Sequence, residues 1–167
     1  AWGAGGQADA TLLTELLQSE PWFALPAPKS TGRDLFNRDW LEKRLNIYST
    51  GDGQIAEIAD APAQNIQATL RRLTAETVAR SVQTYAADAK EVLVCGGGAR
   101  NAALMADLQQ ALPCEVRTTD SEGIGTQDVE ALAFAWLAWA HQQGIPAGNP
   151  AVTGAKGMRI LGAYWPA

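Results

Sequence analysis

The sequence predicts an α/β protein whose parallel sheet is incomplete in this chain. Helical and strand patterns alternate along the 167 residues in the order α, loop, α, β, α, β, α, which is typical of helices packed on a parallel sheet. Hydrophobic residues make up 47% of the chain and charged residues 19%, enough apolar material for a sizeable core. Only two strands are clear, fewer than a stable parallel sheet needs. We therefore expect that strands are missing from this chain.

The first third of the chain predicts two helices separated by a loop. Residues 1–9 hold three glycines and are expected to form a flexible or linker segment. Asp9 is placed to cap a helix with leucines at positions 12, 13, 16 and 17. Residues 19–34 are rich in proline and predict a loop. Asn37 is placed to cap a short helix that runs through Leu45, and a second loop is expected over 48–53.

The middle of the chain predicts a long helix followed by a buried strand. Asp60 and Pro62 indicate a helix start, and apolar residues then recur at steps of three or four as far as Tyr85, which gives a helix of about 25 residues. Residues 91–95 form a short apolar run, typical of a buried parallel strand. Three glycines at 96–98 end the strand.

The last third predicts helix, strand and helix. Leucines four residues apart at 104, 108 and 112 mark a helix, and residues 114–118 a second strand. The final helix is expected over 126–143, with Gly144 as its stop. Its apolar run, 131–140, predicts a buried helix, with Trp136 and Trp139 in the core.

Composition excludes several classes of protein. The formal net charge is -5 and there is no basic block, which argues against nucleic acid or an anionic membrane as a partner. Two cysteines and one histidine offer neither a disulfide framework nor a four-ligand zinc site, so no metal site is expected. No apolar run reaches the roughly 18 residues of a membrane span, and no signal peptide opens the chain. We expect a cytoplasmic protein, and the absence of an initiator Met suggests a piece of something larger.

The strongest local feature is a strand that runs into Gly96, Gly97 and Gly98 and then into a helix that starts near Asn101. Glycines let a backbone approach a ligand closely, and a helix start offers N–H groups and a positive dipole end, as a nucleotide phosphate requires. The segment matches neither the phosphate loop of P-loop proteins nor the dinucleotide-binding fingerprint. A tight strand-to-helix turn without a ligand is the competing interpretation. Asn101 favours a ligand, because its amide can read a sugar hydroxyl or a base edge.

Two further groups of side chains are candidates for ligand binding. Asp128 and Glu130 stand at the start of the apolar helix, where their carboxylates could hydrogen-bond a polyol; the alternative is that they only complement the helix dipole. Lys29 and Arg33 flank Ser-Thr-Gly and could hold a phosphate or carboxylate, or belong to a solvated loop. His141, late on its helix, needs no catalytic role.

Several stretches together resemble the C-terminal half of the 1,6-anhydro-N-acetylmuramic acid kinase family, over almost the whole chain. The family has the two-lobe sugar kinase, Hsp70 and actin fold, with ATP in the cleft. The resemblance implies that residues 1–167 are the C-terminal part of a nucleotide-binding lobe. The matching stretches are 24–37, 93–101 (LVCGGGARN), 118–120, 128–138, 152–155 and 159–163.

The resemblance also implies an activity and a distribution of roles. In the family, water attacks the anomeric carbon of the anhydro sugar and the 6-oxygen takes the γ-phosphate of ATP, giving N-acetylmuramic acid 6-phosphate during peptidoglycan recycling. The expected cofactors are ATP and Mg²⁺. Gly96, Gly97, Gly98 and Asn101 would form the adenosine side of the nucleotide site. Glu130 would reach the sugar with Asp128 close by, and the segment from Lys29 to Arg33 would line the cleft.

The sequence lacks two elements that are typical of the family. It contains no Gly-Thr-Ser/Met-Asp-Gly element and no Asp-Thr-Gly-Pro-Gly-Asn element, so the phosphate loops and the catalytic base are expected in an N-terminal half that is absent here. We expect this N-terminal half to be the partner of the chain, and the chain alone to be inactive. Whether the protein also forms a homodimer is left open. The alternatives are another sugar kinase of the same fold and a nucleotide-binding domain without catalysis.

Overall fold

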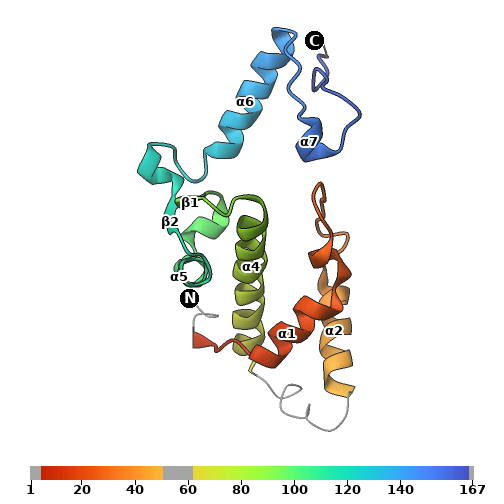
Figure 1. The fold of residues 1–167 in the computed structure, drawn as a ribbon, viewed down its shortest axis with the longest axis vertical. Helices are drawn as coiled ribbons and strands as arrows, with labels where there is room; N and C mark the ends of the chain where they lie inside the picture. Colours follow the sequence, from red (N-terminus) through yellow and green to blue (C-terminus); the bar gives the residue numbers. More distant parts are fainter. Residues whose placement is uncertain (1–4, 51–61, 166–167) are drawn as a thin grey trace. The chain divides into compact units, whose positions relative to one another are not determined.

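The computed structural model describes residues 5–50 and 62–165 (Figure 1). The chain divides into two compact units, which we describe one at a time. The helical unit comprises Ala1–Leu25, Ser30–Val92 and Asn101–Val116, and the C-terminal unit comprises Pro26–Lys29, Leu93–Arg100 and Arg117–Ala167.

Among the described residues of the helical unit there are four α-helices, and two predicted caps start two of them. The Asp9 side chain accepts a hydrogen bond from the Leu12 N–H at 2.7 Å, and Asn37 Oδ1 accepts one from the Trp40 N–H at 2.9 Å. Each satisfies a helix N–H that lacks a partner within the helix. The helices are α1 (Ala10–Ser19), α2 (Arg38–Thr50), α4 (Ala63–Tyr85) and α5 (Ala102–Ala111), with a short 3₁₀ helix, η2 (Pro21–Ala24), after α1.

Two boundaries differ from the sequence prediction or fall outside the described residues. Helix α2 continues to Thr50, so the loop predicted over 48–53 is wrong in its first three residues, and 51–53 lie outside the described residues. The predicted long helix is confirmed as α4, 23 residues with Pro62 at its N-cap position. Asp60, which marked its predicted start, also lies outside the described residues.

The core of the helical unit lies between α1 and α4. Leu12, Leu16 and Leu73 are buried together, with side chains from α2 packed against them. Helix α4 also buries Thr69 completely, and its hydroxyl receives a hydrogen bond from the Asp9 N–H at 2.9 Å. The Gln7 N–H donates to Asn65 Oδ1 at 3.0 Å. Residues 7–9, predicted as part of a linker, are thus hydrogen-bonded to α4.

Helices α4 and α5 are joined by two arginines. Arg71 forms an ion pair with Asp107 at 2.5 Å, and Arg72 donates to Gln110 at 2.6 Å. The Arg71 and Asp107 side chains are both less than one fifth exposed. These contacts add a fixed orientation to the apolar packing between the two helices.

In the described part of the chain, the sheet has two short parallel strands, β1 (Glu91–Val94) and β2 (Glu115–Thr118), connected through α5. Both strands were predicted within one residue of their observed ends. The predicted burial of the first strand is wrong: residues of β1 alternate between exposed and half-buried, and Leu93 is 40% exposed. A sheet of two strands requires a helix or another layer packed on its faces to bury its side chains.

The C-terminal unit contains helix α6 (Val129–Gln142), the four-residue helix α7 (Pro150–Thr153), and two 3₁₀ helices, η3 (Gly97–Arg100) and η4 (Thr119–Glu122). Helix α6 starts three residues later than predicted and ends near Gly144, which takes a left-handed φ of 66°. The prediction that α6 is buried is wrong, because Trp136 is 50% and Trp139 51% exposed. Among its residues only Ala140 is buried. None of the described helices is both long and apolar enough to span a bilayer.

Candidate functional site

The glycine turn after β1 leaves open space beside its backbone. Gly96 has a φ of 79°, which side-chain-bearing residues rarely adopt. A Cβ atom built on Gly96 or on Gly97 would meet no other atom within 4 Å. Gly98 lies in η3, directly after the turn. A ligand can therefore approach the main chain of this turn closely.

A backbone hydrogen bond joins the glycine turn to the segment before α6. The Gly96 N–H donates to the Thr126 carbonyl oxygen at 2.7 Å. Thr126 is only 8% exposed, and its own N–H donates to Asp120 Oδ1 at 3.1 Å. Two features that the sequence predicted separately, the glycines and the start of the apolar helix, thus lie side by side.

The two predicted carboxylates at the start of α6 are exposed. Asp128 occupies the N-cap position but its side chain caps no N–H. It lies close to Gly125, where any Cβ would collide with the Asp128 carboxylate. Glu130 is in the first turn of the helix. Within the C-terminal unit neither carboxylate forms a hydrogen bond or an ion pair among the described residues, so both are available to a ligand.

Asn101 serves as a helix cap. Its side chain accepts a hydrogen bond from the Leu104 N–H at 3.3 Å, at the start of α5. This occupies the amide oxygen, while the NH₂ group still offers two donors. The structure thus gives Asn101 a local structural role, and its role toward a nucleotide stays a prediction.

The predicted pair of cations is divided between the two units. Lys29 is half-buried and belongs to the C-terminal unit, whereas Arg33 is exposed and belongs to the helical unit. In the C-terminal unit, the ring of Pro28 lies against Gly154, where an added Cβ would come within 3.2 Å of Pro28 Cγ. Gly154 also has a φ of 71°. Two segments of the family resemblance therefore meet at a position that only glycine fits well.

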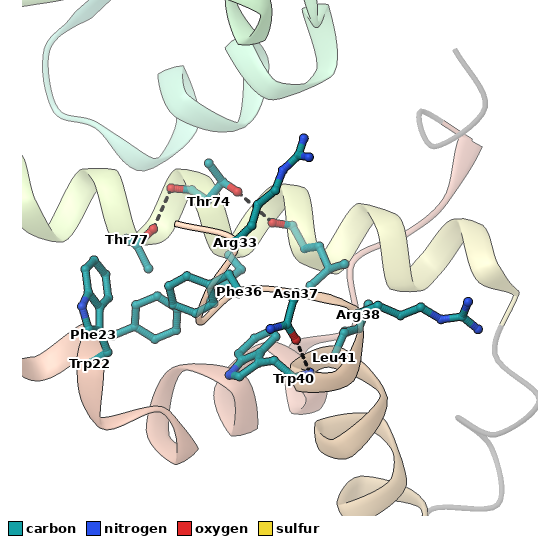
Figure 2. A pocket seen from close by; sticks show the side chains of 12 residues that line it. Trp22, Phe23, Arg33, Phe36, Asn37, Arg38, Trp40, Leu41, Thr74 and Thr77 are labelled. Atoms are coloured by element: carbon teal, nitrogen blue, oxygen red, sulfur yellow. Dashed lines mark hydrogen bonds between the residues drawn. The ribbon is translucent and has the colours of Figure 1, made fainter. Parts of the chain in front are cut away.

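Arg33 borders an aromatic hollow in the helical unit, which the sequence analysis did not predict (Figure 2). The hollow measures about 790 Å³. Phe23 and Phe36 are stacked with ring centres 5.3 Å apart, and Trp40 meets Phe36 edge-on at 5.1 Å. Figure 2 shows the Arg33 side chain extending away from these rings. The concentration of aromatic residues at 22, 23, 36 and 40 was the signal available in the sequence.

A buried carboxylate holds the aromatic cluster. Glu20 is 7% exposed and accepts hydrogen bonds from the Trp40 indole N–H at 2.8 Å and from Arg44 at 3.1 Å. Burial alone would raise the pKa of Glu20. The hydrogen bonds from Trp40, the Trp22 N–H and Arg44, together with the Arg44 charge, outweigh burial and hold that pKa below its usual value. Glu20 is therefore a charged structural anchor at neutral pH.

Over 5–50 and 62–165, no three histidine, cysteine, aspartate or glutamate side chains come together in a group that could hold a metal ion. Asp128 and Glu130 stand at the start of α6, next to the segment that Thr126 joins to the glycine turn. The arrangement is suited to hydrogen bonding of a ligand through backbone and carboxylates.

Comparison with known proteins gives one consistent result. The profile of the anhydro-N-acetylmuramic acid kinase family matches residues 1–167. The chain is 54% identical to the anhydro-N-acetylmuramic acid kinase of Bordetella petrii over 99% of its own length, and 55% identical to that of Bordetella avium. It is 47% identical to the protein of the same name from Pseudomonas syringae. The chain spans 42–43% of the length of these relatives.

Proposed function

Because the chain belongs to the anhydro-N-acetylmuramic acid kinase family, we propose that it is the C-terminal part of the nucleotide-binding lobe of an ATP-dependent sugar kinase. The observation that carries this proposal is the match of the whole chain to the family, at more than half identity to the Bordetella proteins. The substrate is 1,6-anhydro-N-acetylmuramic acid, and the setting is peptidoglycan recycling in the cytoplasm. The kinase family implies use of ATP.

The reaction combines ring opening with phosphoryl transfer. Water adds to the anomeric carbon and loses a proton to a base, while the bond from that carbon to the 6-oxygen breaks. The 6-oxygen takes the γ-phosphoryl group of ATP, leaving ADP and N-acetylmuramic acid 6-phosphate. Phosphoryl transfer depends on the positioning of both substrates and on stabilisation of the developing charge.

The glycine turn is suited to the nucleotide. Open space beside Gly96 and Gly97 allows a flat or charged group to reach the backbone, and Gly98 and Asn101 continue the segment into α5. Mg²⁺ is typical of kinases, but the described residues hold no cluster for it.

The carboxylates at the start of α6 are suited to the sugar. Glu130 and Asp128 are exposed and uncommitted within their unit, beside the segment that Thr126 ties to the glycine turn. In this proposal Glu130 accepts a hydrogen bond from a sugar hydroxyl and Asp128 supports it. From the family resemblance we also assign Lys29 and Arg33 the role of contributing positive charge to ligand binding.

Activity requires more polypeptide than this chain, which spans 42% of the Bordetella petrii enzyme. The test compares the purified chain with a single polypeptide in which it is joined to the unmatched part of that enzyme. ATP-dependent phosphorylation of the anhydro sugar is expected only for the joined protein. Turnover by the chain alone would contradict the proposed division of the site. A joined protein that prefers another sugar would indicate a different sugar kinase, and nucleotide binding without any turnover would indicate a non-catalytic domain.

The role of Glu130 is tested in the same joined protein with Glu130→Gln. Loss of one hydrogen bond to a charged group, about 1.5–3 kcal/mol, lowers kcat/KM by about 10- to 150-fold. The control is Glu15→Gln, a change of the same chemistry on α1. If Glu130→Gln keeps normal turnover but has a lowered melting temperature, Glu130 does not bind the sugar. Its role would then be to stabilise the start of α6 by complementing the helix dipole.

A further inference from the structure

Helix α6 has two apolar faces on opposite sides. The helical repeat places Leu132, Trp136 and Trp139 in one stripe. Phe134 and His141 lie on the opposite side, where the C-terminal segment returns: His141 Nδ1 and the Leu161 carbonyl oxygen are 3.0 Å apart. A hollow of about 430 Å³ remains between that side and residues 161–164.

The stripe of Leu132, Trp136 and Trp139 has no cover in its own unit. Leu132 is 53%, Trp136 50% and Trp139 51% exposed. No charged residue occurs between Glu130 and His141. The stripe therefore has no charged side chain that could be hydrated or could pair with a charged partner. Adjacent exposed tryptophans on a helix are costly in water and typical of an interface.

We propose that this stripe is the docking surface for the polypeptide that the curated relatives possess beyond the part matched by this chain. The relatives are more than twice as long as the matched part, since the chain spans 42% of the Bordetella petrii protein. The occupant is a folded apolar layer of that polypeptide, because an apolar stripe without charges requires an apolar counterpart. The proposal shares with the proposed function the premise of a longer enzyme, but it concerns assembly and not catalysis.

The experiment is hydroxyl-radical footprinting of tryptophans, read by mass spectrometry. It uses the isolated chain and the single polypeptide in which the chain is joined to the unmatched part of the Bordetella petrii enzyme. Trp165, 86% exposed in the same unit, is the internal control. Oxidation of Trp136 and Trp139 is expected to fall by about ten-fold or more in the joined protein, as in a desolvated interface core, while that of Trp165 stays the same.

A variant tests the face itself. In the joined protein, Trp136→Lys places a charge in the proposed interface and is expected to restore oxidation of Trp139 to its level in the isolated chain. Trp165→Lys, the matched control, leaves Trp139 protected. Far-UV circular dichroism of both variants verifies that helix content is kept.

Each other outcome overturns the proposal. Protection already present in the monomeric isolated chain would mean that its own helical unit covers the stripe. Protection that grows with concentration of the isolated chain would mean that a second copy covers it. Oxidation unchanged in the joined protein would mean that nothing docks there. Kinase activity measured on the same samples separates the two ideas: activity without protection contradicts only the docking surface, and protection without activity contradicts only the catalytic proposal.

Discussion

Helices α4 and α6 have opposite relations between composition and burial. Helix α4 is rich in polar residues, yet five of its side chains are buried: Ala68, Thr69, Leu73, Ala75 and Ala79. Helix α6 is apolar over nearly its whole length, yet among its residues only Ala140 is buried. Whether a helix is buried depends on the elements that pack against it. Its own composition indicates only how much apolar surface those elements must bury.

The neighbours of α4 are within its own unit. Helix α1 packs against it through Leu12 and Leu16, and α5 is held to it by the ion pair between Arg71 and Asp107. In the C-terminal unit, α6 has the returning C-terminal segment on one side. The difference teaches that α4 is covered by two helices of its own unit that are distant in sequence, whereas α6 is covered by the returning segment on one side.

The largest expected effect contrasts a leucine of the helical core with a leucine of α6. Leu16 is fully buried and Leu132 is 53% exposed. Leu16→Ala leaves a cavity and is expected to lower the free energy of unfolding by about 2–5 kcal/mol, whereas Leu132→Ala changes it by less than about 0.5 kcal/mol in the isolated chain. Urea denaturation followed by circular dichroism measures both. Equal losses would erase the contrast between the two regions.

A smaller effect is expected at the buried carboxylate. Glu20→Gln removes the charge that Trp40 and Arg44 bind and is expected to cost about 1.5–3 kcal/mol of stability. Glu15→Gln, on α1 without a hydrogen bond or ion pair of its side chain among the described residues, is the control and is expected to be neutral. A Glu20→Gln protein as stable as the parent would show that burial cancels the hydrogen bonds.

The same residue predicts a pH dependence. The pKa of Glu20 is lowered from its usual value of about 4.5, so the unfolded chain binds this proton more readily than the folded one. The stabilisation is complete above the usual value and is lost as pH falls through the lower folded value. The difference in unfolding free energy between the parent and Glu20→Gln should shrink as the pH is lowered below about 4.5. A difference that stays constant to lower pH would contradict the lowered pKa.

The smallest expected effect distinguishes a cap from a ligand at Asn101. Asn101→Ala removes the bond to the Leu104 N–H and is expected to cost about 1 kcal/mol. Asn101→Ser keeps a capping oxygen and should retain stability. If Asn101 also binds the nucleotide, both variants of the joined protein weaken ATP binding, as calorimetry would show. Full affinity in Asn101→Ser would leave Asn101 as a cap alone.

Most local features of the fold were predictable because they depend on neighbours in sequence. The caps at Asp9 and Asn37 are confirmed, as is the glycine-ended strand β1. Helix α2 was predicted too short: no residue between Leu45 and Thr50 is a glycine or a proline that would stop a helix, and the observed helix continues to Thr50. The burial of β1 and α6 was predicted wrongly, because burial depends on distant segments.

The candidate site was predictable in its motifs but not in their arrangement. The glycines at 96–98 and the carboxylates of α6 were named from sequence. The hydrogen bond from Gly96 to Thr126 joins residues thirty apart, which no local pattern specifies. The aromatic hollow was missed because Phe36 stacks on Phe23 only after the loop between them folds back.

The hydrogen bond between Gly96 and Thr126 also allows ligand binding to be measured by hydrogen exchange at one amide. The Gly96 amide hydrogen cannot exchange with deuterium from solvent until the 2.7 Å bond to the Thr126 carbonyl opens. Its exchange rate therefore measures how often the glycine turn parts from the segment that leads into α6. A ligand that bridges the two loops slows this one amide selectively, while the amide of Val152, in the short helix α7, keeps its rate. Occupancy of the site can thus be read at a single backbone position, without a chemical probe attached to the protein and without turnover.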